Sequence, residues 1–314
     1  MPLVKKTDVM SERPVIIVLY GTPGTGKTSF ATTAKNPLLL DCDRGFDRAC
    51  QRVDTVTASR WEDIYNTENI GQTIVENGQQ KFVPGVIADY DTIIIDTAKS
   101  MLDDYLAAYA VQKNYKLATN SLKRFGQMAD DFKLFVNTVR SFGKDIIFIC
   151  HDKETQEGDI IKHSPDCTGQ SKDLLVRIAD QVGYLCKENG HRVVKFEPMD
   201  TRVGKNVAQI EDYFVPEYGT AEFSTCMADI IARVKSSIMS KGEAQAEAIR
   251  QLDEAKKKLE AVTTTDEANA MREVAKSLAK IHQKAFGQLM MAELEKKGFV
   301  LDKETKMFIQ KQAA

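Results

Sequence analysis

Residues 14–28 decide the fold of this chain. Residues 14–20 read Pro-Val-Ile-Ile-Val-Leu-Tyr, and residues 21–28 continue as Gly-Thr-Pro-Gly-Thr-Gly-Lys-Thr. The first run is uninterrupted, apolar and β-branched, which is typical of a strand buried on both faces of a parallel sheet. The second matches the pattern G-x-x-x-x-G-K-[ST] at every fixed position, and a short helix is predicted over residues 27–35. The stretch therefore predicts a strand, a phosphate-binding loop and a helix in succession.

Each part of the loop has a chemical reason. Glycine lets the main chain curl until successive N–H groups point at phosphate oxygens, and the helix N-terminus adds the positive end of its dipole. We expect Lys27 to reach the β- and γ-phosphates and Thr28 to bind Mg²⁺ through its hydroxyl. The predicted nucleotide-binding residues are Gly21, Thr22, Pro23, Gly24, Thr25, Gly26, Lys27, Thr28 and Ser29.

Further apolar runs alternate with amphipathic segments downstream. Buried strands are predicted over residues 37–42, 91–96 and 145–150, and helices over residues 101–118 and 127–142. Asn189 and Gly190 predict a tight turn between two short strands, which places an antiparallel hairpin at one edge of the sheet. The polar residues 44–88, with a weak helical pattern near Trp61, and 152–172 are interpreted as connections. This alternation predicts an α/β fold with a mostly parallel, twisted sheet.

Composition excludes several classes of protein. The chain has 314 residues, with 43 Lys and Arg against 45 Asp and Glu, so a uniformly basic nucleic-acid coat is excluded while a local basic groove is not. It contains no uncharged apolar stretch of 18 residues, so no membrane span is expected. The six cysteines form no C-x-x-C pair and are interpreted as reduced thiols of a cytoplasmic protein.

The composition changes after about residue 224, where Ala, Lys, Glu and Gln begin to dominate. We therefore expect an α/β core over residues 1–224 and a helical region over residues 225–314. Thr264 and Glu267 have the spacing of a capping box between the two helices of a hairpin. The predicted apolar stripes are Ile249, Leu252, Leu259 and Val262, then Met271, Val274, Leu278, Ile281, Ala285 and Leu289. This hairpin is interpreted as a packing or oligomerisation element, or as a partner-binding or DNA-guiding appendage.

Acidic and polar side chains follow the predicted strands. Asp96 closes the third strand, where a carboxylate suits the magnesium side of a phosphate site. The next residue is Thr97 rather than a Glu that could activate the attacking water, so the water-activating carboxylate has to come from another strand or loop. Asp41 and Asp43 both follow the second strand, and Asp43 is favoured because it lies further past the carboxyl edge. His151, after the fourth strand, is a candidate contact for the γ-phosphate or the attacking water.

Taken together, these strands and their motifs resemble the RecA-type ATPase core over roughly residues 12–215. More narrowly, they are similar to phage-encoded, RadA-like nucleotide-binding proteins that act as single-strand annealing proteins. The resemblance implies a RecA-like P-loop core that binds and hydrolyses ATP with Mg²⁺, binds single-stranded DNA and promotes annealing or recombination in the host cytoplasm. Its catalytic residues would be Lys27, Asp43 and His151. Asp43 stands where RecA-type proteins usually carry Glu, and His151 where RecA carries Gln.

The resemblance also implies a homo-oligomeric ring or filament with ATP between subunits. A neighbour would donate a cation, for which the candidates are Lys153, Arg202 and Lys205. DNA contact is expected at basic residues interleaved with aromatic ones, and these are Lys113, Lys116, Lys123 and Arg124. A single-strand DNA-binding protein is a further candidate partner.

Two other functions remain open. One is a nucleotide-gated partner module, such as a helicase loader or an assembly ATPase, that works through its helical region. The other is a small-molecule kinase, which would need an Arg-rich lid, whereas residues 152–172 contain no Arg. ATP rather than GTP follows from the resemblance, and the chain lacks an Asn-Lys-x-Asp motif for reading guanine.

Overall fold

The computed structural model describes residues 3, 5–8, 11–302 and 304–310. Its contacts divide the chain into two compact units, Glu12–Ile238 and Met1–Ser11 with Met239–Ala314. The division falls later than the boundary expected at residue 224. The reason is that the first turns of α6 (Cys226–Ala261) bury Met227, Ile230 and Val234 against one face of the sheet.

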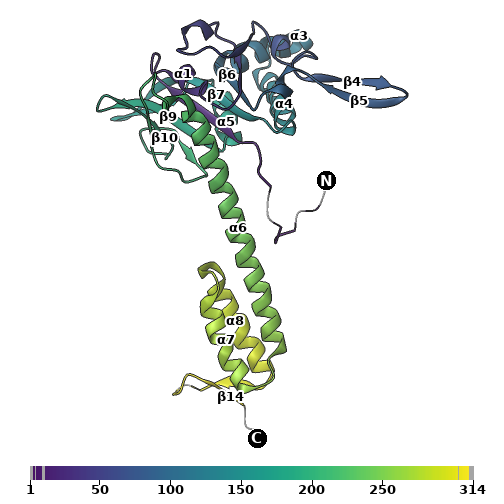
Figure 1. The fold of residues 1–314 in the computed structure, drawn as a ribbon, viewed down its shortest axis with the longest axis vertical. Helices are drawn as coiled ribbons and strands as arrows, with labels where there is room; N and C mark the ends of the chain where they lie inside the picture. Colours follow the sequence, from purple (N-terminus) through teal and green to yellow (C-terminus); the bar gives the residue numbers. More distant parts are fainter. Residues whose placement is uncertain (1–2, 4, 9–10, 303, 311–314) are drawn as a thin grey trace. The chain divides into compact units, whose positions relative to one another are not determined.

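The larger unit is built on a mostly parallel sheet (Figure 1). Its strands lie in the order β12 (Tyr213–Val215), β10 (His191–Lys195), β9 (Gln181–Glu188), β1 (Ile16–Gly21), β7 (Asp145–Glu157), β6 (Thr92–Asp96), β2 (Pro37–Asp41) and β3 (Asp54–Thr57). The pairs from β9 to β3 are parallel, and β10 is antiparallel to both neighbours. Short β11 (Lys205–Asn206) pairs with β9. The predicted α/β fold is confirmed, and the turn at Asn189 and Gly190 has positive φ at both residues.

Alternate residues of β1 enter two different cores, which explains its uninterrupted apolar run. Ile16 and Val18 pack with α4 (Ser121–Ser141), whereas Ile17 and Leu19 pack with α1 (Lys27–Ala31) and α6. The helix predicted over residues 127–142 is confirmed as the larger part of α4, which buries Met128, Phe132, Phe135, Val136 and Val139. Two further helices are α2 (Trp61–Ile64) and α5 (Gly169–Ile178).

The helix expected over residues 101–118 is subdivided. It begins as a π-helical segment, Ser100–Leu106, continues as α3 (Ala107–Lys113) and ends in a 3₁₀ turn, Tyr115–Ala118. The Asn114 side chain accepts a hydrogen bond from the Lys116 N–H and so separates the last two pieces. This places a bend inside the segment for which DNA contact was predicted.

The prediction that residues 152–172 form a connecting loop is wrong. Strand β7 continues beyond Cys150 as far as Glu157, turns at Gly158 with φ +64°, and pairs with antiparallel β8 (Ile160–Pro165). Residues 153–157 are exposed, so the ribbon has no apolar alternation for a sequence pattern to detect. Main-chain pairing, which sequence periodicity does not report, holds it together.

The connection over residues 44–88 also contains strands that were not predicted. Besides β3 it holds a hairpin of β4 (Gly71–Glu76) and β5 (Gln79–Pro84), joined by Asn77 and Gly78 with positive φ at both. The same Asn-Gly signal that predicts the later hairpin is therefore present here. Most side chains of β4 and β5 are exposed, which again removes the apolar period.

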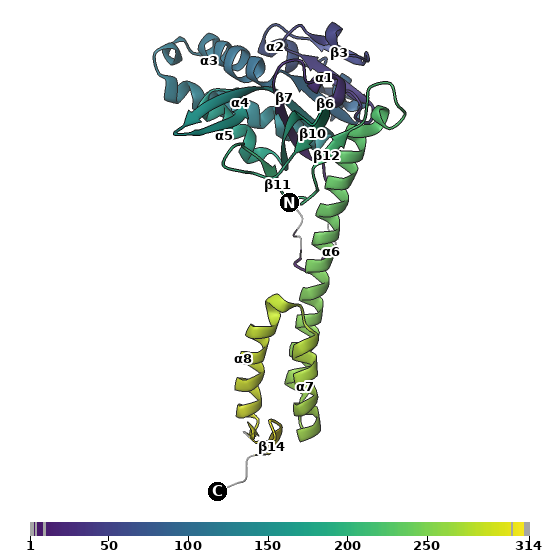
Figure 2. The same cartoon turned by 90° about the vertical axis from the view of Figure 1, so that its left-hand side faces the viewer.

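The smaller unit confirms a helical C-terminal region but corrects its details. Helices α7 (Thr265–Ser277) and α8 (Lys280–Lys296) lie side by side (Figures 1 and 2) and are followed by short β13 (Phe299–Leu301) and β14 (Phe308–Gln310). The capping box of Thr264 and Glu267 is confirmed. The buried residues of this unit include Leu259, Met271, Leu278, Phe286, Met290, Leu294 and Phe308.

The prediction of the second apolar stripe is wrong beyond Leu278. Leu278 has extended backbone angles and ends α7, and Ile281 is 82% exposed. The Gln283 side chain donates to the carbonyls of Lys276 and Leu278, which stabilises the break between the helices. Among the described residues, no helix is both long and apolar enough to span a membrane.

Candidate functional site

The loop after β1 requires glycine at several positions. Gly24 and Gly26 have φ of +79° and +87°, a region that residues with a Cβ rarely adopt. A Cβ on Gly21 would lie 2.2 Å from the Leu185 carbonyl oxygen on β9. Helix α1 begins at Lys27, directly after the loop, so its N-terminal N–H groups face the curled main chain.

Lys27 is held against the inside of the loop. Its ammonium donates to the carbonyls of Gly21 at 2.8 Å and Thr22 at 3.0 Å, and only 6% of the residue is exposed. Burial lowers the pKa of this ammonium, and the charge of Asp96 acts in the opposite direction. Because phosphate oxygens are stronger acceptors than carbonyls, Lys27 is placed to transfer these hydrogen bonds to a phosphate.

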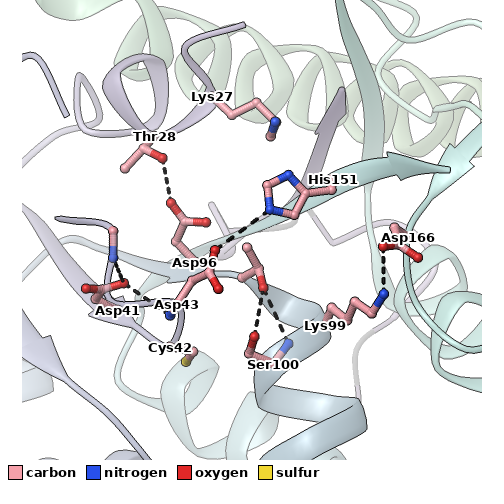
Figure 3. A network of polar contacts seen from close by, with 12 residues as sticks. Lys27, Thr28, Asp41, Cys42, Asp43, Asp96, Lys99, Ser100, His151 and Asp166 are labelled. Carbon is pink, nitrogen blue, oxygen red and sulfur yellow. Dashed lines mark hydrogen bonds and ion pairs between the residues drawn. The ribbon is translucent and has the colours of Figure 1, made fainter. Parts of the chain in front are cut away.

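Thr28 of α1, which follows β1, meets Asp96 at the end of β6 although β1 and β6 are not neighbours in the sheet. β7 lies between β1 and β6, yet the Thr28 hydroxyl donates to an Asp96 carboxylate oxygen at 2.6 Å (Figure 3). Burial raises the pKa of Asp96; the hydrogen bond from Thr28 lowers it, while the charges of Asp41 and Asp43 raise it further. A hydroxyl and a half-buried carboxylate in contact are oxygen donors that fit a hard divalent cation such as Mg²⁺.

The structure separates Asp41 from Asp43. Asp41 is 1% exposed, and its carboxylate accepts main-chain N–H bonds from Asp43, Gly45 and Phe46. It therefore shapes the turn after β2. The Asp43 side chain is 46% exposed and faces His151, with 3.8 Å between its carboxylate and Nε2 (Figure 3).

His151 lies at the carboxyl edge of the sheet, opposite Gly21 in the register of β7 and β1. Its Nδ1 is buried and has no hydrogen-bond partner among the described residues. Asp43 and His151 thus form a polar pair beside Asp96. Nearby, Lys99 forms an ion pair with Asp166 at 2.7 Å, which ties the segment after β6 to the segment after β8.

The structure does not bring the Ser29 side chain into the loop. Ser29 is 6% exposed, and its hydroxyl accepts a hydrogen bond from the Cys50 N–H at 3.0 Å. This contact anchors residues 46–50 on the first turn of α1. Ser29 therefore connects the phosphate loop with a neighbouring segment.

The three candidate trans cations differ in their contacts. Lys205 donates to the carbonyls of Val176 and Arg177 at the end of α5, and the Arg202 guanidinium donates to the Glu197 carbonyl. Lys153 lies on the exposed part of β7. Of these three side chains, only that of Lys153 has no hydrogen-bond or ion-pair partner among the described residues.

The four candidate DNA residues lie between the last residue of α3, Lys113, and the first turn of α4, which contains Lys123 and Arg124. Lys113, Lys116 and Lys123 are exposed, and Arg124 is half-buried with a hydrogen bond to the Ala118 carbonyl. Tyr115, in the same segment, is 78% exposed. Lys113 lies over the Tyr109 ring at 4.6 Å. The segment therefore presents cations next to an exposed ring.

A comparison with protein families matches the AAA domain over residues 13–207, more than half of the chain. The chain belongs to the AAA domain family. Its larger unit is thus an AAA-type P-loop ATPase domain, in agreement with the curled loop and the Thr28–Asp96 contact. Among curated proteins, it is similar to the SPbeta prophage-derived uncharacterized protein YorG of Bacillus subtilis (strain 168). The two are 22% identical over 238 residues, which cover 69% of this chain and 67% of the relative.

One cation beside the AAA domain's loop was not singled out from the sequence. Arg192, on β10, reaches Gly26, where a Cβ would lie 3.3 Å from its Nη1. Its place two residues after the Asn189–Gly190 turn was the available signal, because this turn lies at the same edge of the sheet as the loop.

Proposed function

We propose that this AAA domain binds Mg–ATP at the loop of residues 21–28 and hydrolyses it. The single observation that carries the proposal is the 2.6 Å contact between Thr28 and Asp96, next to the buried Lys27 ammonium. It brings the Thr28 hydroxyl and the Lys27 cation of α1 together with the carboxylate at the end of β6, at the carboxyl edge of the sheet. That combination serves a metal-bound triphosphate.

The residues would divide the work as follows. Lys27 binds the β- and γ-phosphates, and Thr28 with Asp96 would hold Mg²⁺, which neutralises charge that develops on the phosphates. Asp43 accepts a hydrogen bond from the attacking water and orients it. His151, 3.8 Å from Asp43, contacts the same water or the γ-phosphate. Asp43 is shorter than the glutamate common in RecA-type proteins, which favours slow hydrolysis.

We further propose that the protein binds single-stranded DNA and promotes annealing or recombination as a ring or filament. Support comes from the exposed cations in the segment from the end of α3 to the first turn of α4, which also contains Tyr115, from the resemblance to RecA-like annealing proteins, and from a prophage-derived relative. In such an assembly, Lys153 is the favoured cation for a neighbour's ATP because its side chain is exposed. A single-strand DNA-binding protein fits as a partner that presents the strand.

The test is the ATPase rate with and without single-stranded DNA, together with DNA binding at two salt concentrations. Stimulation by DNA with salt-sensitive binding supports the proposal. Hydrolysis with no affinity for DNA contradicts the DNA part. Phosphate transfer to an added nucleoside or nucleotide would indicate a kinase instead.

A second candidate is a nucleotide-gated partner module, such as a helicase loader. The observation that favours it is the separate apolar core of the smaller unit, around Leu259, Phe286 and Leu294. A region with its own core is able to bind a partner without contributing to ATP hydrolysis. Hydrolysis without DNA affinity is the result that this candidate predicts.

A further inference from the structure

The side of the phosphate loop away from Asp96 carries a second set of polar groups. Asp96 and His151 lie on β6 and β7, whereas β9, β10 and β12 lie on the other side of β1. The turn between β9 and β10 and the end of β12 both lie at the edge of the sheet that holds the loop, as the registers of these strands require. A nucleotide with its γ-phosphate near Asp96 would have room to extend its other end in this direction.

Arg192 points from β10 to the loop. Its Nη1 would lie 3.3 Å from a Cβ on Gly26, so the guanidinium approaches the last loop residue before Lys27. The guanidinium forms no hydrogen bond or ion pair within the described part of the chain, although the residue is half-buried. A permanently charged group placed in this way has five N–H donors available for an anion.

A cavity of about 280 Å³ opens beside Arg192. Its lining includes Lys187, His191, Arg192, Pro216, Glu217 and Tyr218. Pockets that hold small molecules begin at about 300 Å³, so the space suits one nucleoside rather than a large ligand. Lys187 and Arg192 favour the anionic end of a ligand, and Arg192 also approaches Gly26 of the phosphate loop.

The Tyr218 ring is fixed at the rim of this cavity. Its hydroxyl donates to the Cys50 carbonyl at 2.8 Å, and its ring meets Phe223 edge-on at 5.6 Å. Because the Cys50 N–H donates to Ser29, the ring is tied to the first turn of α1. The side chain is 53% exposed, which leaves area for a base to stack on.

We infer that Arg192 binds the α-phosphate in cis and that the Arg192–Tyr218 cavity holds the nucleoside of the bound nucleotide. The inference rests on the proposed function and extends it to the part of the site that selects nucleotides over inorganic phosphates. Arg192 would bind substrate, whereas Asp43 and His151 act at the γ-phosphate. Its removal is therefore expected to change KM and leave kcat almost unchanged.

The experiment compares the affinities of ATP and inorganic tripolyphosphate for the full chain. Arg192→Ala is expected to lower the affinity for each of the two ligands by about tenfold or more, since a charge-assisted hydrogen bond contributes a factor of this size. Arg192→Lys should recover part of the loss. Tyr218→Ala should weaken ATP alone, because tripolyphosphate has no base. Arg177→Ala, which removes an exposed guanidinium elsewhere in the same unit, is the matched control and should bind as the wild type does.

The outcomes separate this inference from the proposed function. If the wild type binds no nucleotide, both fail. If the wild type binds, Lys27→Ala does not, and Arg192→Ala matches the wild type, the inference alone is overturned. A fall in kcat at unchanged KM for Arg192→Ala also overturns the inference. An equal loss of affinity for ATP and for tripolyphosphate in Tyr218→Ala overturns it as well. Circular dichroism and Tm of each variant establish that it is folded.

Discussion

Single residues at the sheet edge show how position decides between chemically equal side chains. Asp41 and Asp43 alternate in the same way along the chain, but Asp41 is enclosed by three N–H donors and Asp43 faces His151. The carboxylate that lies further beyond the strand is thus the one available to a ligand. The roles of Lys27 and Asp96 lead to two predictions at this scale.

Replacing Lys27 by Ala is expected to lower kcat for ATP hydrolysis by at least about a hundredfold, because a preorganised cation at the phosphates is lost. The far-UV circular dichroism spectrum should not change, since the Lys27 ammonium hydrogen-bonds to two loop carbonyls and to no other group that the structure describes. Lys35→Ala is the matched control, because Lys35 lies close by in sequence but has an 80% exposed side chain. Undiminished turnover in Lys27→Ala would contradict the site.

Asp96→Asn is expected to abolish Mg²⁺-dependent hydrolysis and to raise the Tm of the ligand-free protein at pH 7.5. Burial raises the pKa of Asp96, so the folded state favours its protonated form. That contribution to stability is complete below the ordinary pKa and is lost as the pH rises through the raised one. The Tm difference between variant and wild type should therefore shrink toward pH 4. A Tm difference that does not change with pH would refute this interpretation.

Much of this site was predictable from the sequence, because the loop motif fixes Gly21 to Thr28 and a strand end fixes Asp96. Arg192 and the structural role of Asp41 were not. Each depends on a long-range or main-chain contact, between β10 and the loop or between Asp41 and the turn after it. The side-chain pattern along the chain carries no record of such contacts.

At the scale of elements, the buried strands were predicted and the polar hairpins were not. β1, β2, β6 and the first half of β7 contain apolar side chains because both faces of the sheet are covered. The β7–β8 ribbon and β4–β5 extend into solvent and lack that pattern. The segment from the end of α3 to the first turn of α4 is a third polar stretch, and its proposed role is testable.

Charge reversal of Lys116 and Lys123 to Glu is expected to remove stimulation of the ATPase by single-stranded DNA and leave the basal rate intact. The slope of log K for DNA binding against log salt concentration should become less steep by about 1.4, since each lost phosphate contact on a single strand contributes about 0.7 to this slope. The matched control reverses Lys35 and Lys133, two exposed lysines of the same unit. If the control loses as much DNA affinity as the variant, the segment from the end of α3 to the first turn of α4 is not the DNA surface.

On the scale of the whole molecule, the chain combines an AAA domain with a unit that has its own core. Phe286, in that second core, is 1% exposed, and a Phe→Ala change in such a place costs about 3–5 kcal/mol. Phe286→Ala is therefore expected to unfold the smaller unit at a lower temperature, in a separate calorimetric transition, while basal ATP hydrolysis persists. A single transition with loss of hydrolysis would show that the two units do not unfold independently.

The central claim is that the loop of residues 21–28 holds a metal-bound triphosphate. A crystal structure with Mn²⁺ and a non-hydrolysable ATP analogue tests it most directly, because anomalous scattering locates the metal. The account predicts a metal peak beside the Thr28 hydroxyl and Asp96, with the β- and γ-phosphates against the Lys27 ammonium. A nucleotide bound elsewhere on the protein, with the metal peak away from Thr28, would contradict it.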